Sequence, residues 1–175
     1  MNSNDIDFLF DEYISKARKE KKRNKKIINI VIIVVVVFII FQLIGIGRVN
    51  SNTMEPNYTN GNIIIYEKWT KDFEKNDIVV IDYDGKIIIR RIIGVYGDQI
   101  DIDNSKGILL INDDNEDNQD IKGITVSDPL GIKFPLYVSE NHYFVLCDDR
   151  SNTADSRKIG CINKSSIIGK VIISI

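Results

Sequence analysis

The sequence predicts an all-β domain carried on a single N-terminal transmembrane helix. One uncharged apolar run near the N-terminus is long enough to cross a membrane. Beyond it, short Ile- and Val-rich segments recur between Asn, Asp and Gly residues, the pattern of strands separated by turns. That later region shows no helical periodicity beyond a single turn near residues 163–166.

Composition limits the classes of function. The 175 residues include 23 Lys and Arg, 25 Asp and Glu, one His and two Cys. One His and two Cys are too few for a typical zinc site, so we expect no metal and no cofactor. Residues 1–47 carry a net charge of +3 and residues 48–175 carry −5. Because the main body is acidic, nucleic acid is not an expected partner.

Residues 27–47 form the predicted membrane span. They contain no charged side chain, and about 20 helical residues cross about 30 Å of hydrocarbon. Eight Lys and Arg lie within residues 16–26. The positive-inside rule therefore predicts a cytoplasmic segment 1–26, an extracytoplasmic domain 48–175 and a location in the plasma membrane. A cleaved signal peptide is the alternative, but the run exceeds the usual length and only Gly45-Ile46-Gly47 offers a weak cleavage site. We expect residues 1–15 to be a solvated tail rather than a short amphipathic helix.

Seven strands are expected in residues 48–175. Asp84-Gly85 between two apolar runs predicts a hairpin. Residues 112–123 are acidic and Asn-rich but lack calcium-loop spacing, so an exposed loop is expected. Cys147 and Cys161 are 14 residues apart, and the sequence leaves open whether they form a disulfide. The expected strands are Asn62–Tyr66, Asp77–Tyr83, Lys86–Val95, Gln99–Ile102, Ile108–Ile111, His142–Cys147 and Ile167–Ile173.

Three polar clusters follow the apolar run in a distinctive order. The first is Ser51-Asn52-Thr53-Met54-Glu55-Pro56, the second runs from Ile89 to Asp98, and the third runs from Tyr143 to Arg157 and ends in DDRSNTADSR. Each taken alone could be a loop or a set of solvated charges. Together, after one membrane helix, they resemble the type I signal peptidases, membrane-anchored serine proteases with a Ser-Lys dyad. The resemblance covers residues 16–173 and implies a signal-peptidase-like β core.

The resemblance also assigns roles by position. The nucleophile position is Thr53 and the general-base position is Arg90, so both members of the dyad are replaced. Ser51 matches the residue that lines the oxyanion hole, and Thr153 matches the Ser that hydrogen-bonds the Lys amine. Met54 and Pro56 match positions that shape the substrate pockets. Asp155 and Arg157 match an ion pair that supports the site.

The two replacements differ in chemical consequence. Thr53 keeps a hydroxyl, although its methyl group restricts the side chain. Arg90 cannot serve as a base, because a guanidinium stays protonated in proteins. Lys86 lies four residues earlier on the same strand, roughly 13 Å from Arg90, which is too far for proton transfer. The distance from His142 to Thr53 is not predictable from the sequence.

Three hypotheses follow. The first is a cleavage-impaired member that binds secreted precursors, or pilin-type surface proteins during assembly, at the cytoplasmic membrane. The second is an active signal peptidase that uses Thr53 with an unidentified base. The third is a membrane-anchored β module with no link to secretion. Family resemblance alone does not establish activity.

Overall fold

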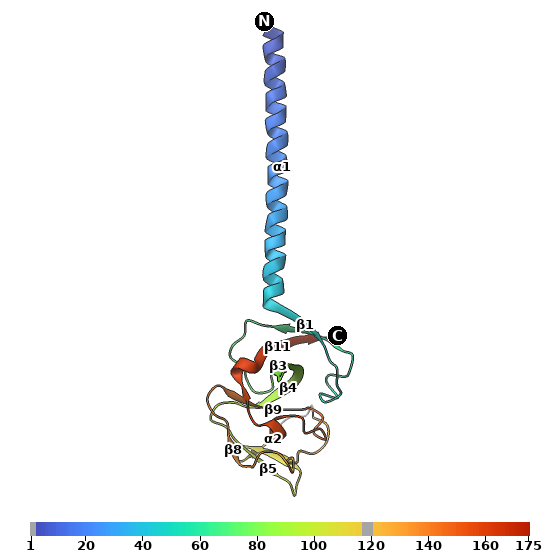
Figure 1. The fold of residues 1–175 in the computed structure, drawn as a ribbon, viewed down its shortest axis with the longest axis vertical. Helices are drawn as coiled ribbons and strands as arrows, with labels where there is room; N and C mark the ends of the chain where they lie inside the picture. Colours follow the sequence, from blue (N-terminus) through green and yellow to red (C-terminus); the bar gives the residue numbers. More distant parts are fainter. Residues whose placement is uncertain (1–2, 117–120) are drawn as a thin grey trace. The chain divides into compact units, whose positions relative to one another are not determined.

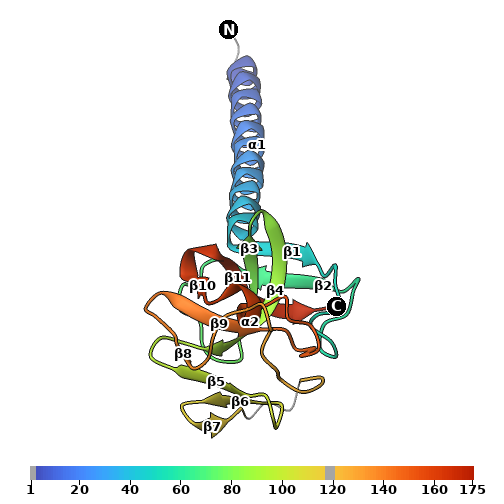
Figure 2. The ribbon, with the colours of Figure 1, turned by 60° about the horizontal axis from the view of Figure 1, so that its bottom comes forward.

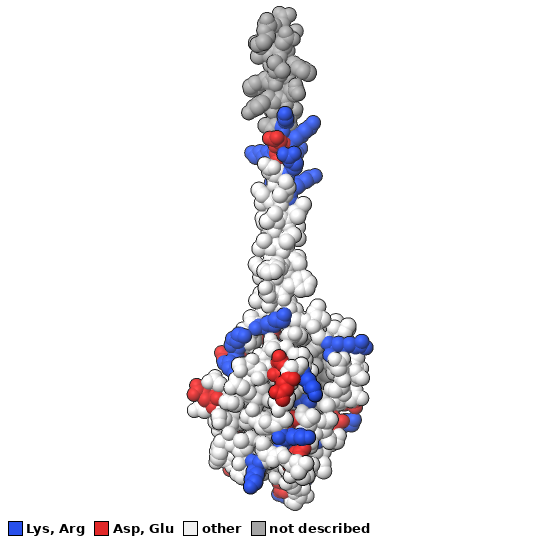
Figure 3. All heavy atoms as spheres, in the orientation of Figure 1, with Lys and Arg blue, Asp and Glu red and all other residues white. Residues whose placement is uncertain are grey.

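A computed structural model describes residues 3–116 and 121–175, and the chain divides into two compact units, Met1–Gln42 and Leu43–Ile175. In the first unit, α1 (Ser3–Leu43) is one long helix (Figure 1). Its part from Arg18 to Leu43 is long and apolar enough to cross a membrane. A band of Lys and Arg precedes an uncharged stretch on this helix (Figure 3). One N-terminal apolar helix fits a single-pass membrane protein, while its orientation stays a prediction, as does the tail, because the side chains of residues 1–15 lie outside the described set.

The expected span, 27–47, is four residues too long at its C-terminal end. The helix ends at Leu43, and β1 (Ile44–Arg48) pairs antiparallel with β2 (Ile63–Glu67) in the second unit. Two glycines in this stretch, Gly45 and Gly47, disfavour helix, and a side chain at Gly45 would collide with the ring of Tyr66. The domain therefore begins before residue 48.

The second unit contains two antiparallel sheets (Figure 2). The larger has the order β1-β2-β11-β3-β4-β9-β10, and the smaller has the order β7-β6-β5-β8. The remaining elements are β3 (Ile78–Tyr83), β4 (Lys86–Gly94), β5 (Gln99–Asp103), β6 (Ile108–Ile111), β7 (Asp114–Asn115), β8 (Leu136–Tyr137), β9 (His142–Leu146), α2 (Ser156–Ile159), β10 (Ile162–Asn163), the 3-10 turn η1 (Lys164–Ser166) and β11 (Ile167–Ser174).

All seven expected strands are confirmed, each within one residue of its predicted ends. The predicted hairpin joins β3 to β4, with Asp84 and Gly85 both at positive φ. The expectation missed β1, whose residues continue the apolar run, and the short elements β7, β8, β10 and α2, which have too few residues to show a period. Of the predicted loop 112–123, Asp114 and Asn115 form β7 and residues 117–120 lie outside the described set.

The sheet is buried on both faces around β3. Val79 and Ile81 point into one apolar cluster, which also contains Val145 and Ile167. The alternating residues Ile78 and Val80 point into a second cluster on the opposite face. A third cluster packs between β9 and the smaller sheet. Residues 78–81 of β3 and 89–94 of β4 are buried, so a polar side chain among them must be paired or face a cavity, whereas Asp82 and Lys86 near the hairpin are exposed.

Close packing of β11 against β2 generates a testable prediction. A Cβ at Gly169 would fall on the backbone carbonyl oxygen of Glu67, which cannot rotate away. We expect Gly169→Ala to lower the free energy of unfolding by roughly 1–3 kcal/mol, as overpacking does. Denaturation of the full chain in detergent, followed by Trp69 fluorescence, measures this.

The matched control is Gly47→Ala. A Cβ there would lie 3.4 Å from Ile64 and 3.7 Å from the ring of Tyr66, which are ordinary contacts. Equal stability of the two variants would contradict the claimed contact at Gly169.

Candidate active site

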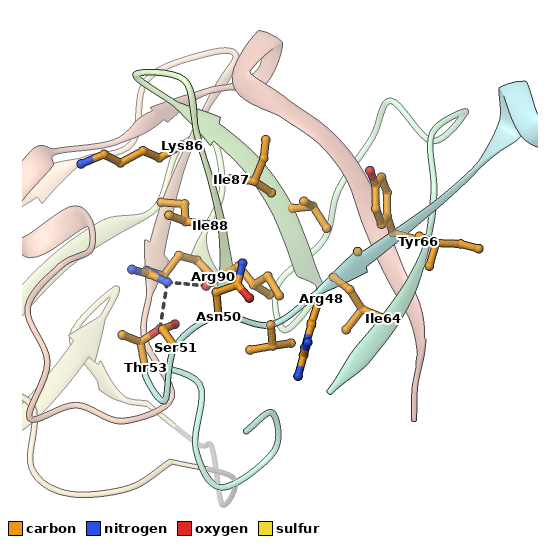
Figure 4. A pocket seen from close by; sticks show the side chains of 15 residues that line it. Arg48, Asn50, Ser51, Thr53, Ile64, Tyr66, Lys86, Ile87, Ile88 and Arg90 are labelled. Carbon is orange, nitrogen blue, oxygen red and sulfur yellow. Dashed lines mark hydrogen bonds between the residues drawn. The ribbon is translucent and has the colours of Figure 1, made fainter. Parts of the chain in front are cut away.

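Three segments converge at the position expected for the dyad. The loop Ser51–Pro56, strand β4 and the loop 147–157 supply the side chains. The Asp149 N–H donates to the Thr53 carbonyl at 3.0 Å, which joins the first and third segments. The Arg90 Nη1 donates to Thr53 Oγ1 at 3.1 Å (Figure 4). The structure thus brings together the two residues that the sequence assigned to the dyad positions.

Arg90 and Arg91 face opposite sides of β4, as successive strand residues must. Arg91 reaches Asp148, whose carboxylate accepts from Nε at 2.7 Å and from Nη2 at 2.6 Å. Asp148 is fully buried, and it also accepts from Asn57 Nδ2 at 2.9 Å. This bidentate pair fastens the start of the loop 147–157 to the strand that carries Arg90.

Arg90 has a different environment. It is 4% exposed, yet its hydrogen bonds with described residues go only to uncharged oxygens. One acceptor besides Thr53 is the Ala154 carbonyl, which lies 3.0 Å from Nε and 2.6 Å from Nη2. The other is the carbonyl of Ile89, the residue before Arg90, at 2.5 Å from Nη1. Among the described residues, no carboxylate forms an ion pair with Arg90.

Thr53 therefore lacks a proton acceptor of the kind a nucleophile needs. Its Oγ1 lies 3.0 Å from Ser51 Oγ, and the guanidinium beside it only donates. No carboxylate, amine or imidazole in the described parts of the chain hydrogen-bonds this hydroxyl. Lys86 lines the same pocket but is exposed, and His142 lines a separate one, with its Nδ1 2.8 Å from Glu140 O.

The predicted Asp155–Arg157 ion pair is present and fully buried. Arg157 donates from Nε at 3.0 Å and from Nη2 at 2.7 Å. The same carboxylate accepts from the N–H groups of Cys147 and Arg157, so it also caps α2. Arg157 donates further to the carbonyls of Arg150 and Asn152. This network gives the loop 147–157 its shape and so positions the Ala154 carbonyl that holds Arg90.

Thr153 does not make its expected contact with Arg90. Its Oγ1 donates to Asp128 Oδ2 at 2.7 Å, and this hydrogen bond is the main reason that the pKa of Asp128 is lowered. The Thr153 hydroxyl proton is directed at a carboxylate, which is a strong acceptor, and this interaction holds the side chain at Asp128 rather than at the guanidinium. The next residue, Ala154, supplies the acceptor for Arg90 through its backbone instead. A comparison of side chains in the sequence could not reveal that a backbone carbonyl is the acceptor for Arg90.

Met54 and Pro56 are also placed differently from expectation. Met54 is 1% exposed and packs in the apolar cluster with Val49, Ile64 and Val80. Neither Met54 nor Pro56 lines the pocket beside Thr53. The chain turns at residues 52–57, which directs the Met54 side chain into the apolar cluster, while Thr53 faces the pocket and Pro56 is exposed.

The pocket beside Thr53 has a volume of about 500 Å³. Its walls come from β1 and from the first half of β4, Lys86–Arg90, so we call it the β1–β4 pocket (Figure 4). Apolar side chains such as Ile46, Ile64 and Ile88 supply most of the lining. The charged lining residues are Arg48, Lys86 and Arg90, and none of the described residues that line it is acidic.

Both cysteines are free thiols in the structure. Cys147 is fully buried. Burial raises the pKa of this thiol to about 12 and that of Cys161 to about 11. Because thiols react as thiolates, neither is a candidate nucleophile at neutral pH.

The Arg91–Asp148 pair generates a stability prediction. Asp148→Asn keeps the shape of the side chain but leaves Arg91 buried without its counter-charge. We expect a loss of about 3–5 kcal/mol in the free energy of unfolding, as for other broken buried pairs. Thermal or chemical denaturation of the full chain in detergent measures this loss.

The exposed pair Lys164–Asp72 offers the control. Asp72 is 97% exposed, so Asp72→Asn should leave stability nearly unchanged. If the two variants unfold alike, the buried pair does not hold the loop in place.

The chain matches the family described as "Signal peptidase, peptidase S26" over residues 23–175. It is 31% identical to Signal peptidase I U of Bacillus subtilis (strain 168), over 69% of this chain and 70% of that protein. It is equally 31% identical to Signal peptidase I of Bacillus amyloliquefaciens, with the same shares covered. A solved signal peptidase I from Enterococcus faecalis is 24% identical and covers 58% of this chain and 97% of that one, with a TM-score of 0.45.

The family match spans far more than half of the residues, and it includes all three segments that meet at Thr53 and Arg90. The chain therefore belongs to the signal peptidase family, peptidase S26.

Proposed function

We propose that this chain is a membrane-bound signal peptidase family protein that binds secreted precursors without cleaving them. The hydrogen bond from Arg90 Nη1 to Thr53 Oγ1 carries the proposal. A Ser-Lys dyad needs a neutral amine to accept the hydroxyl proton, and a guanidinium remains charged. General-base catalysis contributes about 10²–10⁴-fold, so losing the base alone removes most of the rate.

Two unpaired strand edges support a binding role. β1 is the edge strand of the larger sheet and pairs only with β2 among the described strands. On β4, residues 86–90 pair with β3 on one side, while pairing with β9 starts only at Arg91. Both free edges border the β1–β4 pocket, so an extended peptide can add its backbone hydrogen bonds there.

The expected occupant is a secreted precursor at the outer face of the plasma membrane, with the N-terminal segment in the cytoplasm. Relatives named Signal peptidase I support a precursor as the partner class. A pilin-type surface protein during assembly is the narrower version of the same proposal. In both cases the β1–β4 pocket holds an extended segment next to Thr53.

Active cleavage is the second candidate. Thr53 retains a hydroxyl that lies 3.0 Å from Ser51 Oγ, which is the one observation in its favour. This candidate needs a base that approaches Thr53 only when substrate is bound. It makes the opposite prediction in the experiment that follows.

Cleavage of a precursor with an Ala-x-Ala site, read by mass spectrometry, tests the proposal. We expect no product from the unmodified chain in detergent, because Arg90 cannot accept a proton. We expect product from the double variant Thr53→Ser/Arg90→Lys, since a buried Lys can be neutral. Photo-crosslinking to the same precursor, run in parallel, should capture it on both proteins.

Thr53→Ala is the control for the second candidate. Product from the unmodified chain that disappears in Thr53→Ala would show that Thr53 is a working nucleophile. Failure of the unmodified chain to capture precursor at all would remove the binding role.

A further inference from the structure

Arg90 is the exception among the buried arginines that the structure describes. The other three each pair with a carboxylate: Arg91 with Asp148, Arg150 with Glu116 and Arg157 with Asp155. Arg90 makes four hydrogen bonds, all to neutral oxygens. A buried charge without a counter-charge lowers the stability of a fold. The Arg90 cation is therefore available to pair with an anion from outside the protein.

The location of Arg90 indicates where such an anion enters. Arg90 lines the β1–β4 pocket, in which Arg48 and Lys86 are the other charged residues. Three cations and no acidic lining residue give this pocket a positive potential, in a domain whose residues 48–175 carry a net charge of −5. The positive potential of such a pocket attracts a negatively charged group from solution.

Two hydroxyls complete an anion site next to the guanidinium. Ser51 Oγ and Thr53 Oγ1 lie 3.0 Å apart, and both line the pocket. Hydroxyl hydrogens rotate, so each group can donate to an anion oxygen that lies within hydrogen-bond distance of both. Of the five guanidinium N–H groups, one on Nη2 makes no hydrogen bond with any residue that the structure describes.

The remaining walls of the pocket determine which class of molecule can bring the anionic group to Arg90. They are apolar, with Ile46, Ile64 and Ile88 among them, and they lie between the free edges of β1 and β4. A ligand that satisfies all three features has an extended backbone, small apolar side chains and a carboxylate. Phosphate alone or a lipid headgroup lacks the backbone that the strand edges would pair.

We propose that the β1–β4 pocket preferentially binds the C-terminal carboxylate of a peptide, with Arg90 as its counter-charge. This proposal rests on the peptide-binding function proposed above and adds that, among extended peptides, the pocket prefers one that ends in a free carboxylate beside Arg90 over one whose chain continues. In a peptidase the carbonyl beside the nucleophile belongs to an uncut amide. Here the fixed cation favours the charged end instead.

The test compares two peptides that differ only at the C-terminus. Fluorescein-labelled Val-Leu-Ala-Leu-Ala, as free acid or as amide, is titrated with the full chain in detergent micelles and followed by fluorescence anisotropy. We expect the free acid to bind at least about tenfold more tightly, because it gains charge-assisted hydrogen bonds. A third peptide, amide-ended with an internal Asp, separates a terminal carboxylate from a side-chain carboxylate and should bind like the plain amide.

Variants assign the effect to Arg90. Arg90→Met should reduce the preference for the acid to about twofold or less, whereas Lys133→Met, an exposed position outside the pocket, should leave it intact. The comparison of acid with amide on the unmodified chain needs no variant and stands even if Arg90→Met does not fold.

Equal affinity of acid and amide for the unmodified chain would overturn the carboxylate site and leave precursor binding standing. Tight binding of the internal-Asp peptide would also overturn it, since any carboxylate would then suffice. If neither peptide binds while crosslinking still captures the precursor, the carboxylate site is again wrong and the proposed function survives. If the precursor is not captured either, both proposals fail.

Discussion

The buried ion pair between Arg91 and Asp148 is the interaction on which the candidate site depends. It joins the middle of β4 to the beginning of the loop 147–157, with two hydrogen bonds of 2.6–2.7 Å in a region closed to water. From this attachment, Asp149 reaches the Thr53 carbonyl and Ala154 reaches the Arg90 guanidinium. Three segments that are distant in the sequence thereby share one set of hydrogen bonds.

The two adjacent arginines of β4 show how one strand can combine stability with a site. Their opposite directions place Arg91 in the packed interior and Arg90 beside a cavity. The first cation is neutralised by a carboxylate from the protein, and the second is held by backbone carbonyls that do not neutralise it. A buried guanidinium without an acidic partner lowers stability, and the binding of an anion at the proposed site offsets that loss. The same charge leaves the Arg90 guanidinium unable to accept a proton from Thr53.

Much of the fold was predictable from residues alone. Long Ile- and Val-rich strands such as β3 and β4 were found with accurate ends, because alternation and the Asp84-Gly85 turn are local signals. β1 was assigned to the membrane span instead, because Ile44–Gly47 continues an apolar run and its strand character comes only from pairing with β2. Of the candidate site residues, Ser51 and Arg90 both hydrogen-bond Thr53, and Asp155 pairs with Arg157, while their roles stay predictions. Met54 and Thr153 do not make the contacts expected of them, since each has a better partner within the fold.

The sequence by itself determined the membrane-spanning run, the family pattern and the chemical identity of the two changed dyad positions. These depend on residue type and order, and a guanidinium is protonated wherever it lies. Only the tertiary structure decided which hydrogen bonds Arg90 makes, that no described carboxylate neutralises it, and that the cavity beside it is lined by cations and apolar groups. The physical reason is that ion pairing and cavity lining are set by distances between segments tens of residues apart, which packing and strand register determine and local sequence does not.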